Sequence, residues 1–293
     1  MNLITVMSQL PDQESCIAHL EEIRFGNEPF CPRCGVVGEC ARKEEQNYTG
    51  RWNCHSCKST FNVLTGTMFQ GTQLPLQKWF LAIALILNAK KSLSSPQLAR
   101  DLGLKQKAAW YMQQRIRAEM ASKQGRILLE GIIEADETYV GGKPHKRNRR
   151  DDDTPSPRGR ATKKTPVIGA VERGGRVVAR VAEDLSGRGI LQFVKDSLKV
   201  GRSELITDEY KAYKAVEPLL RRRMIDHSKE YARGGLHTNT IEGVWSLLKR
   251  AWYGSHHHYT KQYTPLFVSE TAYKYNARHD LRAFDTFIEG CFA

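Results

Sequence analysis

The sequence predicts a mixed α/β protein in three parts, because its composition changes twice along the chain. Two CxxC cysteine pairs fall within residues 1–70, amphipathic helical patterns occupy 71–122, and short apolar runs typical of strands dominate 123–293. With 293 residues, 40% of them hydrophobic, the chain has room for two or three domains and at least one substantial core. A chain disordered throughout is therefore excluded.

The charge of the chain favours a polyanionic partner. The sequence holds 45 Lys or Arg against 32 Asp or Glu, a formal net charge of +13. Basic side chains that neutralise phosphates release condensed counterions, so nucleic acid is the leading partner class and an anionic membrane surface the alternative. Membrane spanning is not expected, since the longest apolar run, 79–87, is far shorter than the roughly 20 residues required. The start of the chain does not read as a signal peptide, and we expect a cytoplasmic protein.

The first part carries the pattern of a structural metal site. Cys31-Pro-Arg-Cys34 and Cys54-His-Ser-Cys57 are two CxxC units, and paired units of this kind close four thiolates around one zinc ion. His55 and Cys40 lie nearby but fit this spacing less well. Buried or redox cysteines are the alternative. We predict one structural Zn²⁺ held by Cys31, Cys34, Cys54 and Cys57, in a module that binds DNA or docks another protein.

The second part reads as a helix-turn-helix segment. A helix is predicted over 74–88, a short one follows the Ser95-Pro96 start, and Gly103 separates it from a basic helix over 105–120. We expect Lys105, Lys107 and Gln113 to face DNA. A helical hairpin without DNA contacts is the alternative.

A basic, proline-containing loop interrupts the third part at 143–164. It lies between two apolar runs, so we interpret it as an insertion between strands. Lys146, Arg147, Arg149 and Arg150 are its candidate phosphate contacts. A solvated charged loop is the alternative interpretation.

Acidic residues end two of the predicted strands. The apolar run from residue 128 ends in Glu134, Asp136 and Glu137, and a second run ends in Asp208. Acids at the ends of buried strands require a compensating cation, which favours a metal site. Alternation places Glu134 and Asp136 on one face and Glu137 on the other, so we expect only one of Asp136 and Glu137 to join the site. We choose Asp136, with Glu134 in reserve.

A third acid lies on a predicted amphipathic helix that starts at Asn239. At 100° per residue its apolar side chains form one stripe, and Glu242, Ser246 and Lys249 form a polar edge beside it with Asn239. An ordinary solvated helix face is the alternative. The predicted order of the third part is strand, strand, strand, helix, strand, helix and then this helix. That order is the ribonuclease H-like plan, in which the first and fourth strands are adjacent.

Read together, these motifs resemble insertion-sequence transposases of the DDE class, in particular the ISXO-type group with an N-terminal zinc ribbon. The resemblance extends over nearly the whole chain, through residues 31–57, 134–142, 166–169, 207–210, 237–250 and 273–278. It implies that Asp136, Asp208 and Glu242 bind two Mg²⁺ or Mn²⁺ ions, with Lys249 as a basic residue of the site. Asn239 is the alternative third ligand, but we choose Glu242 because an anionic oxygen binds a hard cation better than an amide does.

The same resemblance implies metal-dependent DNA strand cleavage and 3′-hydroxyl strand transfer of an insertion sequence. The zinc ribbon and helix-turn-helix would recognise the terminal inverted repeats of double-stranded DNA, while Lys249, Arg250, Asn239 and the basic loop would hold the backbone. We expect a homodimer or higher oligomer in the DNA complex. A non-catalytic DNA-binding regulator and a structure-specific nuclease are the rival interpretations.

Overall fold

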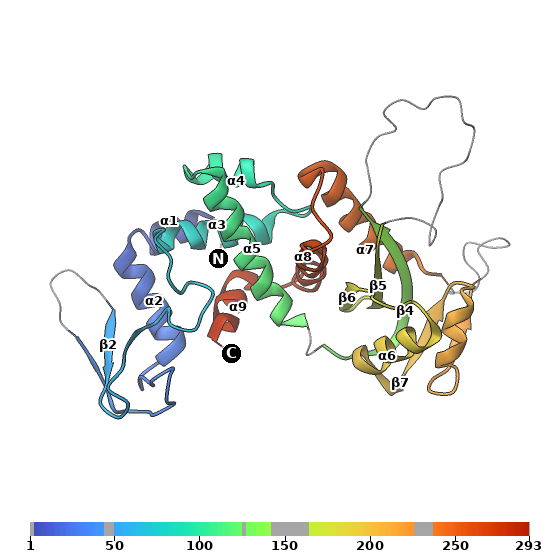
Figure 1. The fold of residues 1–293 in the computed structure, drawn as a ribbon, viewed down its shortest axis with the longest axis horizontal. Helices are drawn as coiled ribbons and strands as arrows, with labels where there is room; N and C mark the ends of the chain where they lie inside the picture. Colours follow the sequence, from blue (N-terminus) through green and yellow to red (C-terminus); the bar gives the residue numbers. More distant parts are fainter. Residues whose placement is uncertain (1–2, 44–49, 125–126, 142–163, 226–236, 293) are drawn as a thin grey trace. The chain divides into compact units, whose positions relative to one another are not determined.

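The computed structural model describes residues 3–43, 50–124, 127–141, 164–225 and 237–292, and the chain divides into two compact units (Figure 1). Unit 1 comprises residues 1–89, 93–119 and 280–293, and unit 2 comprises 90–92 and 120–279. The basic loop with Lys146, Arg147, Arg149 and Arg150 lies outside the described residues. None of the described helices combines the length and apolar character that crossing a bilayer demands.

Unit 1 joins a small zinc-ribbon sheet to a group of helices. Its helices are α1 (Leu3–Gln9), α2 (Gln13–Phe25), α3 (Leu76–Asn88), α4 (Ser95–Leu102), most of α5 (Gln106–Ser122) and α9 (Ala283–Glu289), and the 3₁₀ turn η5 spans Gly290–Phe292. Strands β1 (Cys40–Arg42), β2 (Arg51–Cys54) and β3 (Thr60–Asn62) form an antiparallel sheet in that order. The apolar helix α3 is central and contacts α1, α2, α4 and α9.

The helices α3, α4 and α5 follow the predicted pattern with local corrections. Helix α3 begins at Leu76, not at Leu74, because a residue before proline is disfavoured in helical conformation. The cap of α4 is Ser94, whose Oγ accepts a hydrogen bond from the backbone N–H of Gln97 at 3.3 Å. Gly103 ends α4 in the left-handed conformation, at φ +59°, as the glycine turn predicted.

Unit 2 is built on a five-stranded mixed sheet. Its strands are β4 (Leu129–Val140), β5 (Thr165–Glu172), β6 (Val177–Val181), β7 (Leu198–Thr207) and β8 (Arg222–Met224), in the order β6-β5-β4-β7-β8. The β4–β5 and β5–β6 pairs are antiparallel, whereas β4–β7 and β7–β8 are parallel. The prediction that the first and fourth strands are adjacent is therefore confirmed, and the mixed sheet has the ribonuclease H-like order. Strand β8 was not predicted.

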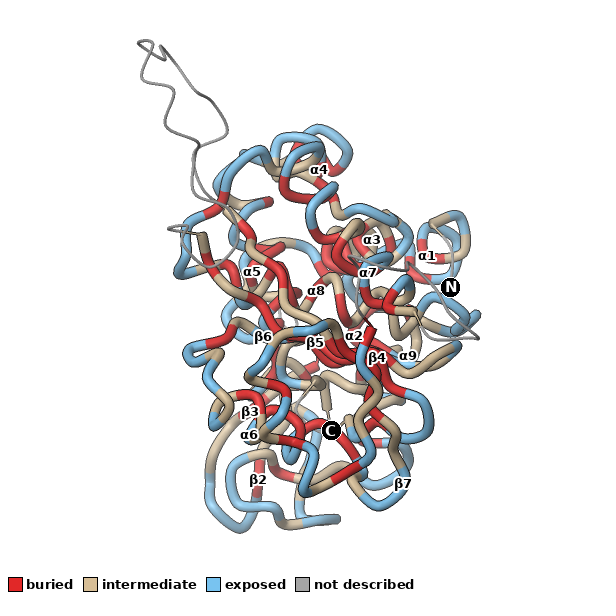
Figure 2. The backbone as a smooth tube through the Cα atoms, turned by 90° about the vertical axis from the view of Figure 1, so that its right-hand side faces the viewer, coloured by how far each residue is buried: buried red, intermediate tan, exposed pale blue. Residues whose placement is uncertain are grey.

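Helices cover both faces of this sheet. Helix α6 (Gly187–Ser197) and the 3₁₀ helix η3 (Lys211–Val216) contribute to one apolar cluster with Ile133 and Ala135 of β4. Helices α7 (Asn239–Arg250) and α8 (Thr264–Asn276), with the π-helical segment η4 (Ala251–His256), contribute to the other. In Figure 2 the strand β5 is largely buried, whereas β4 is buried in its middle and exposed near its start. The even-numbered residues of β4, Glu134 and Asp136 among them, thus belong to the face covered by α7.

Gly169 makes room for the contact between α7 and the sheet. It pairs with Asp136 in the β4–β5 register, and a Cβ atom at this position would lie 2.5 Å from Cη2 of Trp245. Trp245 is buried in the apolar cluster below α7. A glycine is therefore required at position 169, where the indole of Trp245 crosses β5.

We predict that Gly169→Ala destabilises unit 2 by ~1–3 kcal/mol, because the added methyl group overpacks a close contact. Denaturant unfolding measures this. Gly243→Ala is the matched control, since Gly243 lies in α7 and a Cβ atom added there would have no other atom within 4 Å. This control should be neutral or stabilising by up to ~1 kcal/mol through helix propensity. Equal stability of the two variants would contradict the packing argument.

Candidate functional site

A cavity of about 1000 Å³ lies in unit 2 where the ends of β4 and β7 meet α7. Four acids line it: Asp136 and Glu137 from β4, Asp208 just after β7, and Glu242 from the first turn of α7. Three cations also line it: Lys91, Lys249 and Arg250. Strand pairing and helix packing thus collect side chains that lie far apart in the sequence.

One carboxylate oxygen of each predicted metal ligand is held by a hydrogen bond. The indole N–H of Trp245 donates to Oδ2 of Asp136 at 2.9 Å. Oδ1 of Asp208 accepts from the backbone N–H of Tyr210 at 3.0 Å, and Oε1 of Glu242 accepts from the hydroxyl of Thr238 at 3.1 Å. These bonds restrict the rotation of all three carboxylates.

The electrostatics of the cavity disfavour a full set of negative charges. Burial raises the pKa of Asp136 to about 7, and the neighbouring charges of Glu137 and Asp208 act in the same direction. Burial also raises the pKa of Tyr213, with the charge of Glu137 as a further cause, so this phenol stays protonated beside Oε2 of Glu137 at 3.5 Å. A bound cation would offset this crowding of acids.

Both Asp136 and Glu137 line the cavity, and the expectation that only one of them joins the metal site stays a prediction. The alternation itself is correct: Asp136 contacts Trp245 of α7, whereas Glu137 reaches Tyr213 of η3 on the other face. Both side chains are partly buried, and they reach the cavity from opposite faces of β4.

Glu134 has a structural role instead of the reserve ligand role predicted for it. Its side chain is fully buried, and its oxygens accept from Nε of Arg173 at 2.7 Å, from the backbone N–H of Thr240 at 2.8 Å and from that of Ile241 at 3.1 Å. The Thr240 hydroxyl donates a further bond at 2.9 Å. Nδ1 of His237 lies 3.1 Å away, outside hydrogen-bond geometry. A strand carboxylate thus caps the first turn of α7.

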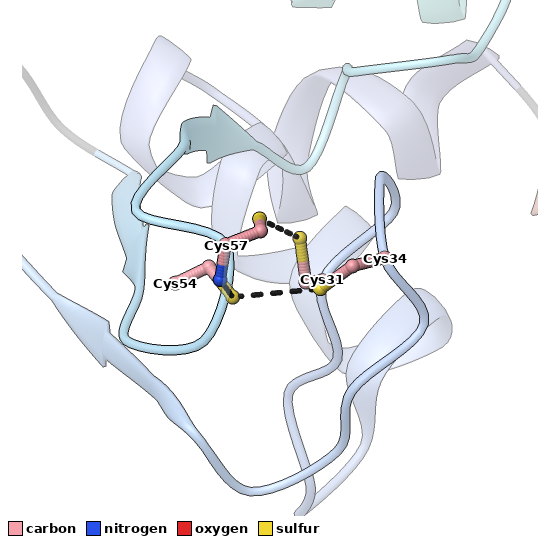
Figure 3. Close-up of side chains that lie close together, drawn as sticks. All are labelled: Cys31, Cys34, Cys54 and Cys57. Atoms are coloured by element: carbon pink, nitrogen blue, oxygen red, sulfur yellow. Dashed lines mark hydrogen bonds between the residues drawn. The ribbon is translucent and has the colours of Figure 1, made fainter.

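The four predicted zinc ligands come together in unit 1 (Figure 3). All four Sγ atoms lie within 4.8 Å of one another, with Cys31–Cys57 at 3.7 Å and Cys34–Cys54 at 3.6 Å. Tetrahedral coordination with Zn–S bonds of about 2.3 Å requires an S···S separation of about 3.8 Å. The residues therefore fit one structural Zn²⁺. Cys40 faces Cys54 across β1 and β2 but stays outside this group.

Comparison with known proteins gives the family. A model described as the ISXO2-like transposase domain matches residues 128–276, and one described as the transposase zinc-ribbon domain matches residues 11–60. The chain belongs to the ISXO2-like transposase family. The first range contains β4, β7 and α7, which form the acid-lined cavity, and the second contains the four cysteines. The resemblance inferred from the sequence is therefore confirmed.

Individual proteins similar to this transposase share less than a third of its sequence. It is 29% identical over 253 residues to an uncharacterized protein in transposable element ISH50 of Halobacterium salinarum, covering 81% of this chain and 82% of that protein. The crystal structure of the Mos1 strand transfer complex matches 73% of this chain and 76% of that one at 14% identity, with a TM-score of 0.28. The Mos1 paired end complex with Mn matches 72% and 74%, again at 14% identity and a TM-score of 0.28. At such TM-scores the likeness carries no structural argument.

The residues of the transposase that were predicted to contact DNA differ in their exposure to solvent. Lys105 and Lys107 are exposed at the start of α5, and Asn239 is exposed at the start of α7 but does not line the cavity. The prediction for Gln113 is wrong. This side chain is fully buried, accepts from the hydroxyl of Ser95 at 2.8 Å and donates to the carbonyl of Leu93 at 2.8 Å, so it joins α4 to α5.

Several cavity residues had no signal in the sequence. Trp245 reads only as a member of the apolar stripe, and the link from its indole to Asp136 follows from the packing of α7 on β5. Lys91 stands in an unremarkable stretch between two helices. No local pattern marks either residue, because tertiary packing brings both to the site: Trp245 through the contact of α7 with β5, and Lys91 through the contacts of its segment with η4.

We predict that Glu134→Ala destabilises the protein by ~3–5 kcal/mol, because it leaves two backbone N–H groups of α7 without their acceptor and removes the carboxylate partner of the half-buried Arg173. Chemical denaturation measures the loss. Glu130→Ala on the same strand is the control, since Glu130 pairs with Lys199 at the surface and should change stability little. Similar losses in both variants would contradict the capping role.

We predict that Cys54→Ser abolishes zinc binding and unfolds the ribbon, because metal ligation supplies most of the folding free energy of so small a module. Metal analysis should give one zinc per wild-type chain and none in the variant, and limited proteolysis should cut the segment around 31–57. Cys40→Ser is the control and should retain the ion. Zinc retained by Cys54→Ser, or lost from Cys40→Ser, would show a different ligand set.

Proposed function

We propose that this transposase cuts DNA strands and joins the resulting 3′-hydroxyl ends to target DNA at the cavity of unit 2. The convergence of Asp136, Asp208 and Glu242 on one cavity supports this proposal most directly. Carboxylate oxygens are the donors that hard divalent cations prefer, and burial together with the charges of Glu137 and Asp208 raises the pKa of Asp136, which a bound cation would offset. The donor set thus fits Mg²⁺ or Mn²⁺.

The spread of the acids fits a two-ion site better than a single ion. Within the described parts of the chain, only the four cysteines place three or more ligand atoms within 4.8 Å of one another. Two ions in phosphoryl-transfer sites are separated by about 3.5–4 Å, so their ligands are spread more widely than those of one ion. We propose Asp136, Asp208 and Glu242 as the ligands. When bound, such ions would activate the attacking oxygen and stabilise the leaving oxygen.

The protein side chains position the DNA for this chemistry. Lys249 and Arg250 lie in the last turn of α7, seven and eight residues after Glu242, and therefore face phosphates about 10 Å from the acids. Trp245 and Thr238 hold the carboxylates of Asp136 and Glu242 in place, which lowers the reorganisation needed during the reaction. Positioning and charge stabilisation are the main contributions that proteins make to phosphoryl transfer.

Other parts of the chain would recognise the element. We propose that Lys105 and Lys107 of α5, together with the zinc ribbon, bind the terminal inverted repeats. Asn239 and the loop with Lys146, Arg147, Arg149 and Arg150 remain proposed backbone contacts. Assembly into a homodimer or higher oligomer on DNA stays a prediction, which light scattering of the DNA complex measures.

We predict that Asp136→Asn lowers both strand cleavage and end joining by more than ~10²-fold while DNA binding is retained, since even residues behind metal ligands contribute 10–100-fold. The substrate is duplex DNA from the regions flanking the gene, with Mg²⁺ present. Glu204→Gln is the control, because Glu204 pairs with Arg221 and Arg223 away from the cavity.

Two outcomes of this assay would redirect the proposal. Unchanged DNA-dependent activity in Asp136→Asn would favour a non-catalytic DNA-binding regulator. Supplying duplexes with precut 3′-hydroxyl ends and a target plasmid distinguishes the second rival, because a structure-specific nuclease forms no joined product from them.

A further inference from the structure

The tripeptide Lys90–Ser92 packs with unit 2, although it lies in the sequence between α3 and α4 of unit 1. Residues of η4 hold it. The hydroxyl of Ser255 donates to the carbonyl of Lys91 at 3.1 Å and also approaches that of Ser92 at 3.5 Å. Nε2 of His256 lies 2.9 Å from the hydroxyl of Ser92. The connection between α3 and α4 is thus held by residues that directly follow α7.

The backbone of this segment is held in an unfavourable conformation. Ser92 has a φ of +75°, a left-handed backbone conformation that residues other than glycine rarely adopt. Its partner residues belong to a π-helical turn, a form that is rare and frequent at functional sites. Strained residues persist where surrounding contacts fix them, and here the contacts from Ser255 and His256 do so. The conformation determines where the preceding residue, Lys91, is placed.

Lys91 lines the same cavity as the four acids, whereas its neighbour Lys90 does not. Both lysines are exposed. Within the described residues, Lys91, Lys249 and Arg250 form no ion pair with a carboxylate, although they share a cavity with four. Cations left unpaired beside acids are suited to bind an anion that enters the cavity.

The arrangement along α7 separates the two kinds of charge. Glu242 is in the first turn and Lys249 in the last, about 10 Å apart along the axis. Successive phosphates of one DNA strand are spaced by about 3.4 Å along the duplex axis, so this distance spans about three nucleotides. A strand whose reacting phosphate lies at the acids therefore presents a phosphate about three nucleotides away to the cationic end.

We propose that Lys91 is a further DNA-binding residue of the active site, contacting a backbone phosphate of the strand being cut, and that Ser255 and His256 are its positioning residues. This inference rests on the proposed function. It assigns to the α3–α4 connection a role in the reaction itself, separate from recognition of the element ends by α5.

The test compares Lys91→Gln with Lys90→Gln in the full chain, because both variants lose one exposed positive charge from adjacent positions. The substrate is duplex DNA from the regions flanking the gene, in saturating amounts, with Mg²⁺. We expect Lys91→Gln to lower the cleavage rate about 10-fold, as for a lost charged hydrogen bond, and Lys90→Gln to stay within about twofold of wild type. Lys91→Arg should recover most of the rate. Thermal unfolding checks that all variants are folded.

A double-mutant cycle tests the positioning role. Ser255→Ala should slow cleavage in the presence of Lys91 and add no further loss to Lys91→Gln, because it acts through that side chain. A purely structural role would instead give additive losses.

The results separate failure of this inference from failure of the proposed function. Equal rates for Lys91→Gln and Lys90→Gln, in an enzyme that cuts DNA and depends on Asp136, would overturn the role of Lys91 alone. Absence of Mg²⁺-dependent cleavage by the wild-type chain would overturn the proposed function, and with it the inference.

Discussion

The buried carboxylate of Glu134 is the contact on which the geometry of the acid site depends. It ties β4 to the first turn of α7 by accepting hydrogen bonds from Thr240, Ile241 and Arg173. Asp136 lies two residues further along the strand, and Glu242 lies one residue beyond the bonded turn. Because the carboxylate is fully buried and fully hydrogen-bonded, a shift of α7 along the sheet would leave a buried negative charge without its hydrogen-bond donors. The spacing of two predicted metal ligands is therefore set by a residue outside the proposed ligand set.

The remaining contacts between α7 and the sheet act in the same direction. Trp245 crosses β5 at Gly169 and donates to Asp136, so the helix is fixed at its middle as well as at its start. Below it, the apolar stripe of α7 packs on the sheet face opposite to the one covered by α6. A rigid support of this kind favours catalysis by preorganised charge, since the carboxylates need not be ordered when DNA arrives.

The sequence predicted the parts of this protein whose signals are local, and it missed those that depend on topology. Paired cysteine spacing, alternation along β4 and the helical stripe from Asn239 each reflect contacts made within a few residues. Strand β8 was missed because three residues at a sheet edge carry too weak a pattern. Gln113 was misplaced because a polar side chain on a basic helix reads as exposed, whereas its amide bonds Ser95 and Leu93 inside unit 1. Lys91 joined the site through a connection that no periodicity describes.

The acids and the cations of the cavity have opposite requirements. On α7, the separation of Glu242 from Lys249 and Arg250 meets both. Four acids need positive charge, and pairing them directly with Lys249 or Arg250 would satisfy that need at the expense of ion binding. Placing the cations about two turns away leaves the acids available to metal ions and the cations available to phosphates. The charges of the site are then compensated only when a polyanion and divalent cations are both bound. Under the proposed function, each bound ligand offsets the charge that repels the other, so DNA binding and metal binding favour each other.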